Sequence, residues 1–334
     1  MLSLPKILII SALASLVGVE VRGDRVLAAN PDHVQQLLTT NNCPSCDLRG
    51  ANLANARLRN ANLSNAELQG ATLTYANLSG ANLTRANLTD TNLGGANLRR
   101  ANMQAAQMRL VNLSNANLTN ANLNRANLDT AKLPGADLTG ASLNQAYLGD
   151  SNLISATLKD ARLPRAVLAA ANLSGADLRG ANFQGAILRG AGCDRSDLTG
   201  ANFVNADLTN TKFAYANLSN ANLRGARLGF AYFYGANLTA ANLTGADLRQ
   251  ANLWRSTLSG ANLVGANLEA ATLPLSRLDR ANLSYSNFTD ADLRGANLDT
   301  ANLSNANFSH ANLIEANLSN ANLTDTNFTE TKFK

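Results

Sequence analysis

The sequence holds few of the side chains that catalysis uses. Its 334 residues include two histidines, three cysteines and one tryptophan. Neither His33 nor His310 is placed beside a candidate nucleophile, although acid–base and nucleophilic catalysis need a base next to the group that it activates. The composition therefore argues against an enzyme, and it indicates no catalytic residue, no cofactor-binding residue and no set of metal ligands.

The chain also lacks an apolar run long enough to cross a membrane. The longest candidate, residues 7–19, is short of the roughly 20 residues that a spanning helix needs. It precedes a run of small residues, typical of a cleavage site, that ends in Ala28 and Ala29. We therefore predict that residues 1–29 are an export signal, cleaved near Ala28 or Ala29, which leaves no membrane span. An uncleaved anchor and a disordered tail are the alternatives.

What the chain has in abundance is a five-residue repeat. From Leu48 through Phe333 every fifth residue is apolar, with 47 Leu, 8 Phe, 2 Met and 1 Cys among 58 positions. The position two residues earlier is Ala in 47 of the 58 repeats. A spacing of five fits neither the three-to-four spacing of a helix nor the alternation of a flat strand. We expect a coiled backbone that turns once per repeat and buries two side chains each time.

The columns of inward phenylalanines predict how many repeats close one coil. Phe183 and Phe203 are 20 residues apart, as are Phe213 and Phe233. A coil of four repeats would place these like residues directly above one another. The predicted fold class is therefore all-β: a four-sided parallel solenoid of about 14 to 15 coils over residues 47–334, with a packed core and no internal cavity.

The A(N/D)LXX pattern, as in Ala51-Asn52-Leu53, resembles the pentapeptide-repeat family over residues 47–334. The resemblance implies a right-handed quadrilateral parallel β-helix, with Leu53, Leu58 and their successors pointing inward. It implies no active site, because the family has none in common. Bacterial and cyanobacterial relatives suggest the periplasm or a thylakoid lumen as the compartment of an exported chain.

A short capping helix is predicted ahead of the repeats, within residues 30–46. Asn30 is a candidate N-cap, Pro31 lies in the first turn, and Val34 and Leu37 share one face. The first coil of a solenoid needs a cover, which is the role that we expect for this helix.

Two cysteines, Cys43 and Cys46, follow this helix directly. In an exported protein they predict a disulfide that ties the cap to the first coil. A redox-active pair is an alternative that lacks the βαβ context of such motifs. A zinc site using His33 would have only three ligands, and Cys193 occupies a Leu position, where we expect a buried apolar side chain.

Outward apolar residues are the candidate partner surface, because a solenoid does not need to expose them. They form two groups, a ladder of Tyr147, Val167 and Ile187 and a cluster of Phe230, Tyr232, Tyr234 and Trp254. Tyr234 and Trp254 are one predicted coil apart. The alternative is local stabilisation, worth about 0.2 to 1 kcal/mol per cross-strand pair.

The charge balance bears on the choice of partner. Some relatives mimic DNA and bind DNA gyrase through an acidic face, whereas this chain has a net charge of +5. Arg85, Arg125 and Arg165 share one column and are interpreted as solubilising, so nucleic-acid binding is disfavoured.

The favoured function is a non-enzymatic scaffold in an exported compartment with an unidentified protein partner. The alternatives are a DNA-mimicking topoisomerase-interacting protein and a redox-active Cys-x-x-Cys protein. A homodimer formed through the C-terminal coil is a further prediction.

Overall fold

The computed structural model describes residues 28–334, which form two compact units, 28–147 and 148–334. The predicted export signal lies outside the described residues, apart from Ala28 and Ala29. One continuous solenoid over residues 47–334 stays a prediction. Within the described residues, no helix is both long and apolar enough to cross a membrane.

Each repeat has the same backbone course, seen for example at Leu48–Leu53. Leu48 points inward, and the next two residues form a turn that is closed where the N–H of Ala51 donates to the carbonyl oxygen of Leu48 at 3.1 Å. The second turn residue, Gly50, has a φ of 67°, as a type II turn requires. Ala51 and Leu53 are buried, while Asn52 between them forms a parallel bridge to Thr72.

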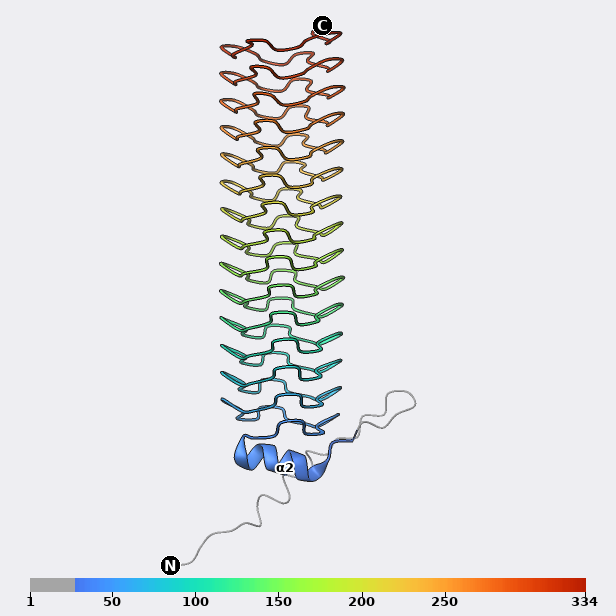
Figure 1. Ribbon diagram of the computed structural model, residues 1–334, viewed down its shortest axis with the longest axis vertical. Helices are drawn as coiled ribbons and strands as arrows, with labels where there is room; N and C mark the ends of the chain where they lie inside the picture. The colour runs from blue at the N-terminus through green and yellow to red at the C-terminus, as the bar shows by residue number, and fades with distance from the viewer. Residues whose placement is uncertain (1–27) are drawn as a thin grey trace, which may run out of the picture. The chain divides into compact units, whose positions relative to one another are not determined.

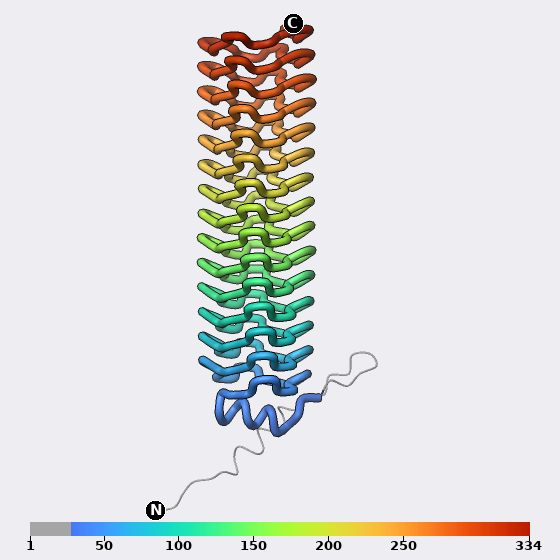
Figure 2. The backbone as a smooth tube through the Cα atoms, viewed as in Figure 1, coloured from blue at the N-terminus to red at the C-terminus, as the bar shows by residue number. Residues whose placement is uncertain are grey.

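Parallel bridges join residues 20 apart throughout each unit, the spacing that the phenylalanine columns predict. Within each unit the backbone winds into stacked coils (Figure 2). The N–H of Leu53 donates to Thr72 in the next coil at 2.7 Å, and the N–H of Thr72 donates back to Ala51 at 2.9 Å. Among the described residues the pairing is by single-residue bridges and not by extended strands. A turn in every repeat leaves only one residue per side in position to bridge.

Helix α2, Pro31–Thr40, covers the first coil of the 28–147 unit (Figure 1). The side chain of Asn30 accepts from the N–H of Asp32 at 3.0 Å, and Pro31 begins the helix. Val34 and Leu37 are fully buried, so this one face of the helix packs on the coil. The helix lies within residues 30–46, and its role as a cap stays a prediction.

The core of the 148–334 unit is a filled column of inward side chains. Phe183 and Phe203 stack at 4.9 Å between ring centroids, and Phe213 and Phe233 stack at 5.0 Å. All four rings are fully buried. The inward residues leave only the outer faces and corners of this unit for binding.

Candidate protein-interaction surface

The aromatic corner of the 148–334 unit consists of Tyr215, Tyr232, Tyr234, Trp254 and Arg255. Except for Tyr232, these residues occupy the two-residue turns that follow inward positions in successive coils. Tyr232 is the bridging residue on the adjoining face. The period of 20 therefore brings side chains from three coils to one corner.

The rings of the aromatic corner contact one another in sequence. Tyr234 is central: its ring centroid lies 5.3 Å from that of Tyr215, 6.2 Å from that of Tyr232 and 5.4 Å from that of Trp254. The guanidinium of Arg255 lies 5.5 Å from the centre of the Trp254 ring, a cation–π distance. A hydrogen bond with Tyr234 raises the pKa of Tyr215 above its ordinary value.

These side chains remain accessible although they pack together. Tyr215 is 56% exposed, Trp254 41% and Tyr232 39%. The turns that carry Tyr215 and Tyr234 directly follow the buried, stacked Phe213 and Phe233. Gly235 leaves room for the ring of Tyr215, since a Cβ at Gly235 would lie 2.9 Å from Cδ1 of Tyr215. The corner thus presents aromatic surface in a fixed arrangement.

An apolar groove extends the same corner beyond Trp254. Its volume is about 700 Å³, and its apolar lining includes Trp254, Pro274, Leu275 and Ile314. Tyr215, Pro274, Leu275 and Ile314 were not among the residues predicted from the sequence. The signal was present, since Tyr234, Trp254, Pro274 and Ile314 occupy one column at multiples of 20.

Phe230, the fourth member of the predicted cluster, lies on a different corner. It lines a separate groove of about 390 Å³ with Arg227, Asp247 and Arg249. Among the described residues it makes no ring contact with the aromatic corner. Phe230 comes before the face that carries Tyr232, whereas Tyr234 comes after that face. The prediction that grouped Phe230 with Tyr234 relied on their closeness in sequence and was wrong about the corner.

The predicted ladder is described in part. Val167 and Ile187 form a parallel bridge in the 148–334 unit, and Ile187 is 39% exposed. Tyr147 belongs to the 28–147 unit, where it bridges to Asn127 and is 50% exposed. A ladder that runs through all three residues stays a prediction.

The column that contains Val167 and Ile187 has a charged residue, Asp207, as its next member. This carboxylate is nearly buried and pairs with Arg189 and with Arg227. Burial alone would raise the pKa of Asp207, but hydrogen bonds from Thr209, Arg227 and Arg189 outweigh it and lower the pKa to about 2. The apolar strip on this face is therefore short.

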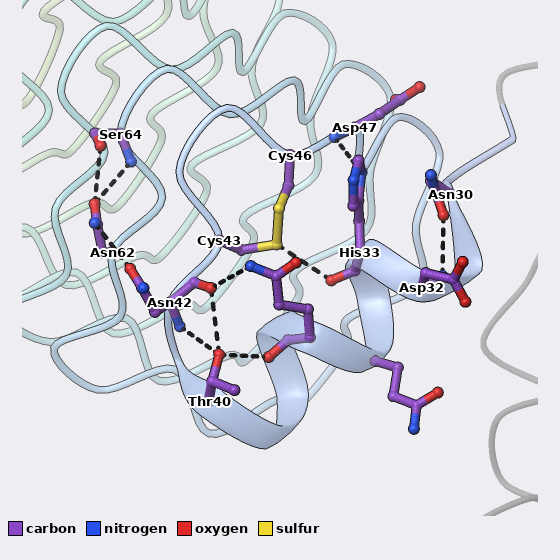
Figure 3. Close-up of a disulfide and its surroundings, with 12 residues drawn as sticks. Asn30, Asp32, His33, Thr40, Asn42, Cys43, Cys46, Asp47, Asn62 and Ser64 are labelled. Carbon is purple, nitrogen blue, oxygen red and sulfur yellow. Dashed lines mark hydrogen bonds between the residues drawn. A yellow bond between two sulfur atoms is a disulfide. The ribbon is translucent and has the colours of Figure 1, made fainter.

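Cys43 and Cys46 are bonded to each other beside helix α2 (Figure 3). The sequence placed them between the cap and the first coil, but both are part of the repeat register: Cys43 takes a Leu position and Cys46 an Ala position. The N–H of Cys43 donates to Asn62 of the next coil at 2.8 Å. Their exposed fractions are 0% and 3%, which disfavours attack by an external thiol.

Helix α2 contacts this coil through both the side chain and the backbone of His33. The N–H of Asp47 donates to Nδ1 of His33 at 3.0 Å, so His33 serves the cap. The Sγ of Cys43 lies 3.2 Å from the carbonyl oxygen of His33. This contact is not a hydrogen bond, because a sulfur in a disulfide carries no hydrogen. Across residues 28–334, no group of three His, Cys, Asp or Glu side chains is arranged to hold a metal ion.

Comparison with solved structures gives several pentapeptide-repeat proteins. HetL of the cyanobacterium Nostoc sp. strain PCC 7120, which is involved in heterocyst differentiation regulation, is 37% identical, with 63% of this chain and 88% of HetL covered and a TM-score of 0.33. QnrB1, a plasmid-mediated fluoroquinolone resistance protein, is 21% identical over 56% of this chain and 88% of its own, also with a TM-score of 0.33.

A pentapeptide-repeat protein of the Arabidopsis thaliana thylakoid lumen is 27% identical over 30% of this chain and 66% of its own, with a TM-score of 0.17. No curated protein matches the chain.

The family model described as pentapeptide repeats matches residues 46–299, in overlapping or adjoining segments, and residues 301–334. The match thus covers nearly the whole of the bridged coils. The five-residue register, the paired inward positions and the bridges at a spacing of 20 are the physical basis of that match. The chain belongs to the pentapeptide-repeat family.

Proposed function

We propose that this protein is a non-enzymatic scaffold that binds a protein partner through its aromatic corner. The observation that carries the proposal is the exposure of Tyr215, Tyr232 and Trp254 in one packed cluster with Arg255. Trp, Tyr and Arg are the residues most enriched at the energetic centres of protein interfaces.

Stabilisation of the protein's own fold does not by itself explain why aromatic side chains gather at this corner. An aromatic pair stabilises its own fold by about 0.5 to 1.5 kcal/mol beyond area burial, and the inward Phe213–Phe233 stack already supplies such a contact below. The outer rings keep exposed fractions of 39% to 56%, so a substantial part of their surface is still available for burial against a partner. Because neighbouring rings already hold these side chains in place, binding a partner would cost little of their conformational entropy.

We further propose that the chain acts in an exported compartment, either the periplasm or a thylakoid lumen. The supporting observations are the apolar run at residues 7–19, which lies outside the described residues, and the bonded pair of Cys43 and Cys46. Disulfides persist mainly in oxidising compartments. A DNA-mimicking function has less support, because it requires an acidic face in contact with a cytosolic enzyme and the net charge is +5.

A pull-down from the native envelope fraction tests the partner proposal. The test variant is Tyr234→Ser/Trp254→Ser, and the matched control is Tyr75→Ser/Tyr285→Ser, which removes two highly exposed tyrosines elsewhere. Circular dichroism verifies that both variants fold. We expect a partner that is retained by the parent and the control and lost from the test variant. Equal retention by all three proteins would contradict a role for this corner.

A homodimer through the last coil of the 148–334 unit is a second proposal. Leu323 and Phe333 occupy inward positions there, yet they are 42% and 47% exposed. An exposed set of inward side chains with open bridging groups is a surface that a second copy could cover. Light scattering during gel filtration tests this proposal: a monomer at high concentration would remove it.

A further inference from the structure

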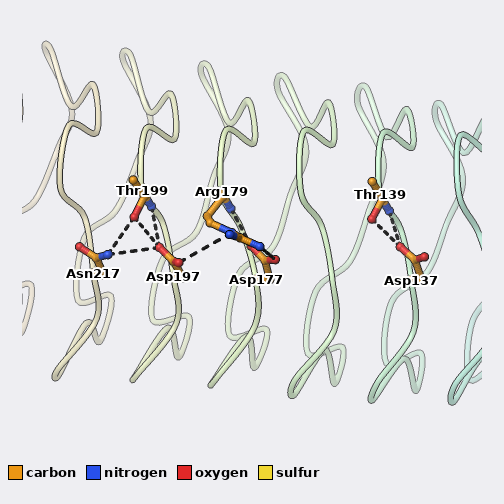
Figure 4. Close-up of polar contacts among 7 residues, drawn as sticks. All are labelled: Asp137, Thr139, Asp177, Arg179, Asp197, Thr199 and Asn217. Carbon is orange, nitrogen blue, oxygen red and sulfur yellow. Dashed lines mark hydrogen bonds and ion pairs between the residues drawn. The ribbon is translucent and has the colours of Figure 1, made fainter.

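An arginine in the first turn position of a repeat is paired when the bridging residue two positions before it is an aspartate. Arg179 folds back on Asp177 with 2.6 Å between Nη2 and Oδ2 (Figure 4). Arg249 pairs with Asp247 and Arg294 with Asp292 in the same way, each at 2.7 Å. The cause is local: the bridging residue and the first turn residue after it project from the same edge of the coil.

Three arginines on one corner of the 28–147 unit lack this arrangement. The residue two before Arg59 is Arg57, and the residue two before Arg99 is Asn97, so neither has a carboxylate to fold onto. Arg100 follows directly on the same corner. None of Arg59, Arg99 and Arg100 forms an ion pair with any described residue.

These guanidinium groups line one groove. Its volume is about 410 Å³, and Arg59, Arg99 and Arg100 surround a centre at Ser79 and Gly80 in the coil between them. A side chain at Gly80 would intrude, since its Cβ would lie 2.3 Å from Oδ1 of Asn60. The lining contains no carboxylate.

Two asparagines of the groove have side-chain amide donors that are not used within the described residues. Asn77 and Asn97 use their Oδ1 atoms to accept from the N–H groups of Ser79 and Arg99, each at 3.1 Å. Their Nδ2 amides donate to no described residue, unlike the many asparagines that donate across coils elsewhere, such as Asn82 to Asn62. Unpaired cations and unused donors together favour an anionic ligand.

We propose that this arginine groove binds a ligand that carries clustered phosphate groups. A guanidinium matches two phosphate oxygens at once, which makes Arg well suited to such groups. Arg59 and Arg99 are two coils apart, or about 10 Å at the usual spacing of paired strands. One orthophosphate would use only part of the donors that Arg59, Arg99 and Arg100 offer, whereas an oligophosphate or neighbouring headgroups can engage all three side chains.

Isothermal titration of the full chain with inorganic tripolyphosphate tests the proposal. The test variant is Arg59→Gln/Arg99→Gln, and the control is Arg85→Gln/Arg125→Gln, which removes the same charge from another corner of the same unit. We expect the Kd to rise at least tenfold in the test variant and less than threefold in the control. No binding by the parent, or equal weakening in both variants, would overturn the proposal.

Vesicles with a bisphosphorylated inositol headgroup separate two sources of the same chemistry. Sedimentation with these vesicles that depends on Arg59 and Arg99 assigns a lipid headgroup. Tripolyphosphate binding without sedimentation assigns a soluble oligophosphate. Both results support the groove, while sedimentation that both variants reduce equally contradicts it.

Discussion

The packing of Tyr215 over Gly235 makes a prediction with a built-in control. Gly235 and Gly245 both have a φ of 63°, and both lie in the second turn position of a repeat. A Cβ at Gly235 would lie 2.9 Å from Cδ1 of Tyr215, whereas a Cβ at Gly245 would have no neighbour within 4 Å. Substitution by Ala therefore imposes the same backbone change at both sites and a clash at only one.

The expected costs follow from these distances. A non-glycine residue in the left-handed region costs about 1 to 2 kcal/mol. The reduced entropy of the unfolded chain returns about 0.4 to 1 kcal/mol. Gly245→Ala should thus destabilise by about 1 kcal/mol. Gly235→Ala should cost about 1 kcal/mol more, because Tyr215 must move off Tyr234 and lose a ring contact of that size.

Urea denaturation followed by circular dichroism measures both substitutions, in the parent and in a Tyr215→Ala background. Removing the ring should remove the difference between the two glycines. Equal costs in the parent, or a difference that persists without Tyr215, would refute this explanation of Gly235.

Three further outcomes are expected. Ser276 has a buried Oγ without a hydrogen-bond partner in the described residues, so Ser276→Ala should stabilise the fold by about 1 kcal/mol. The control Ser256→Ala loses a hydrogen bond to the carbonyl oxygen of Leu253 and should not stabilise the fold. The midpoints of urea denaturation compare the two variants. Because the folded pKa of Asp207 is about 2, below the unfolded value near 3.9, its stabilisation of about 2 kcal/mol is present above pH 4 and lost as the pH falls toward 2. Asp207→Asn should flatten that part of a thermal-melting profile, and an unchanged slope would contradict the ion pairs. Reducing the Cys43–Cys46 bond, whose loop is short, should cost about 2 kcal/mol and raise hydrogen exchange only near helix α2; uniform exchange across the chain would argue against a local role.

The sequence predicts the coil more completely than the surface. Inward residues such as Phe183 and Phe203 are read directly from the register, because a period of 20 determines which side chains stack. The contact of Tyr215 with Tyr234 depends on a turn residue that leans across to the next coil, which the register does not specify. Phe230 was misplaced for a different reason: it is close to Tyr232 and Tyr234 in sequence, but the register puts its turn on another corner.

Charge pairing shows a similar limit. The spacing of Asp177 and Arg179 is plain in the sequence, but only the geometry of the turn shows that they neutralise each other. Arg59, Arg99 and Arg100 stand out as a candidate site because, unlike Arg179, they have no carboxylate to pair with among the described residues. From the sequence alone, the column of Arg85, Arg125 and Arg165 was noted and interpreted as solubilising, and Arg59, Arg99 and Arg100 were not singled out.

The most direct test of the central claim is photo-cross-linking in the native cell. A benzoylphenylalanine replaces Trp254 in one strain and Tyr285, an exposed residue of the same unit, in another. The proposed function predicts one discrete cross-linked partner from position 254 and none from position 285. The absence of an adduct at 254, or the same adducts from both positions, would contradict partner binding at the aromatic corner.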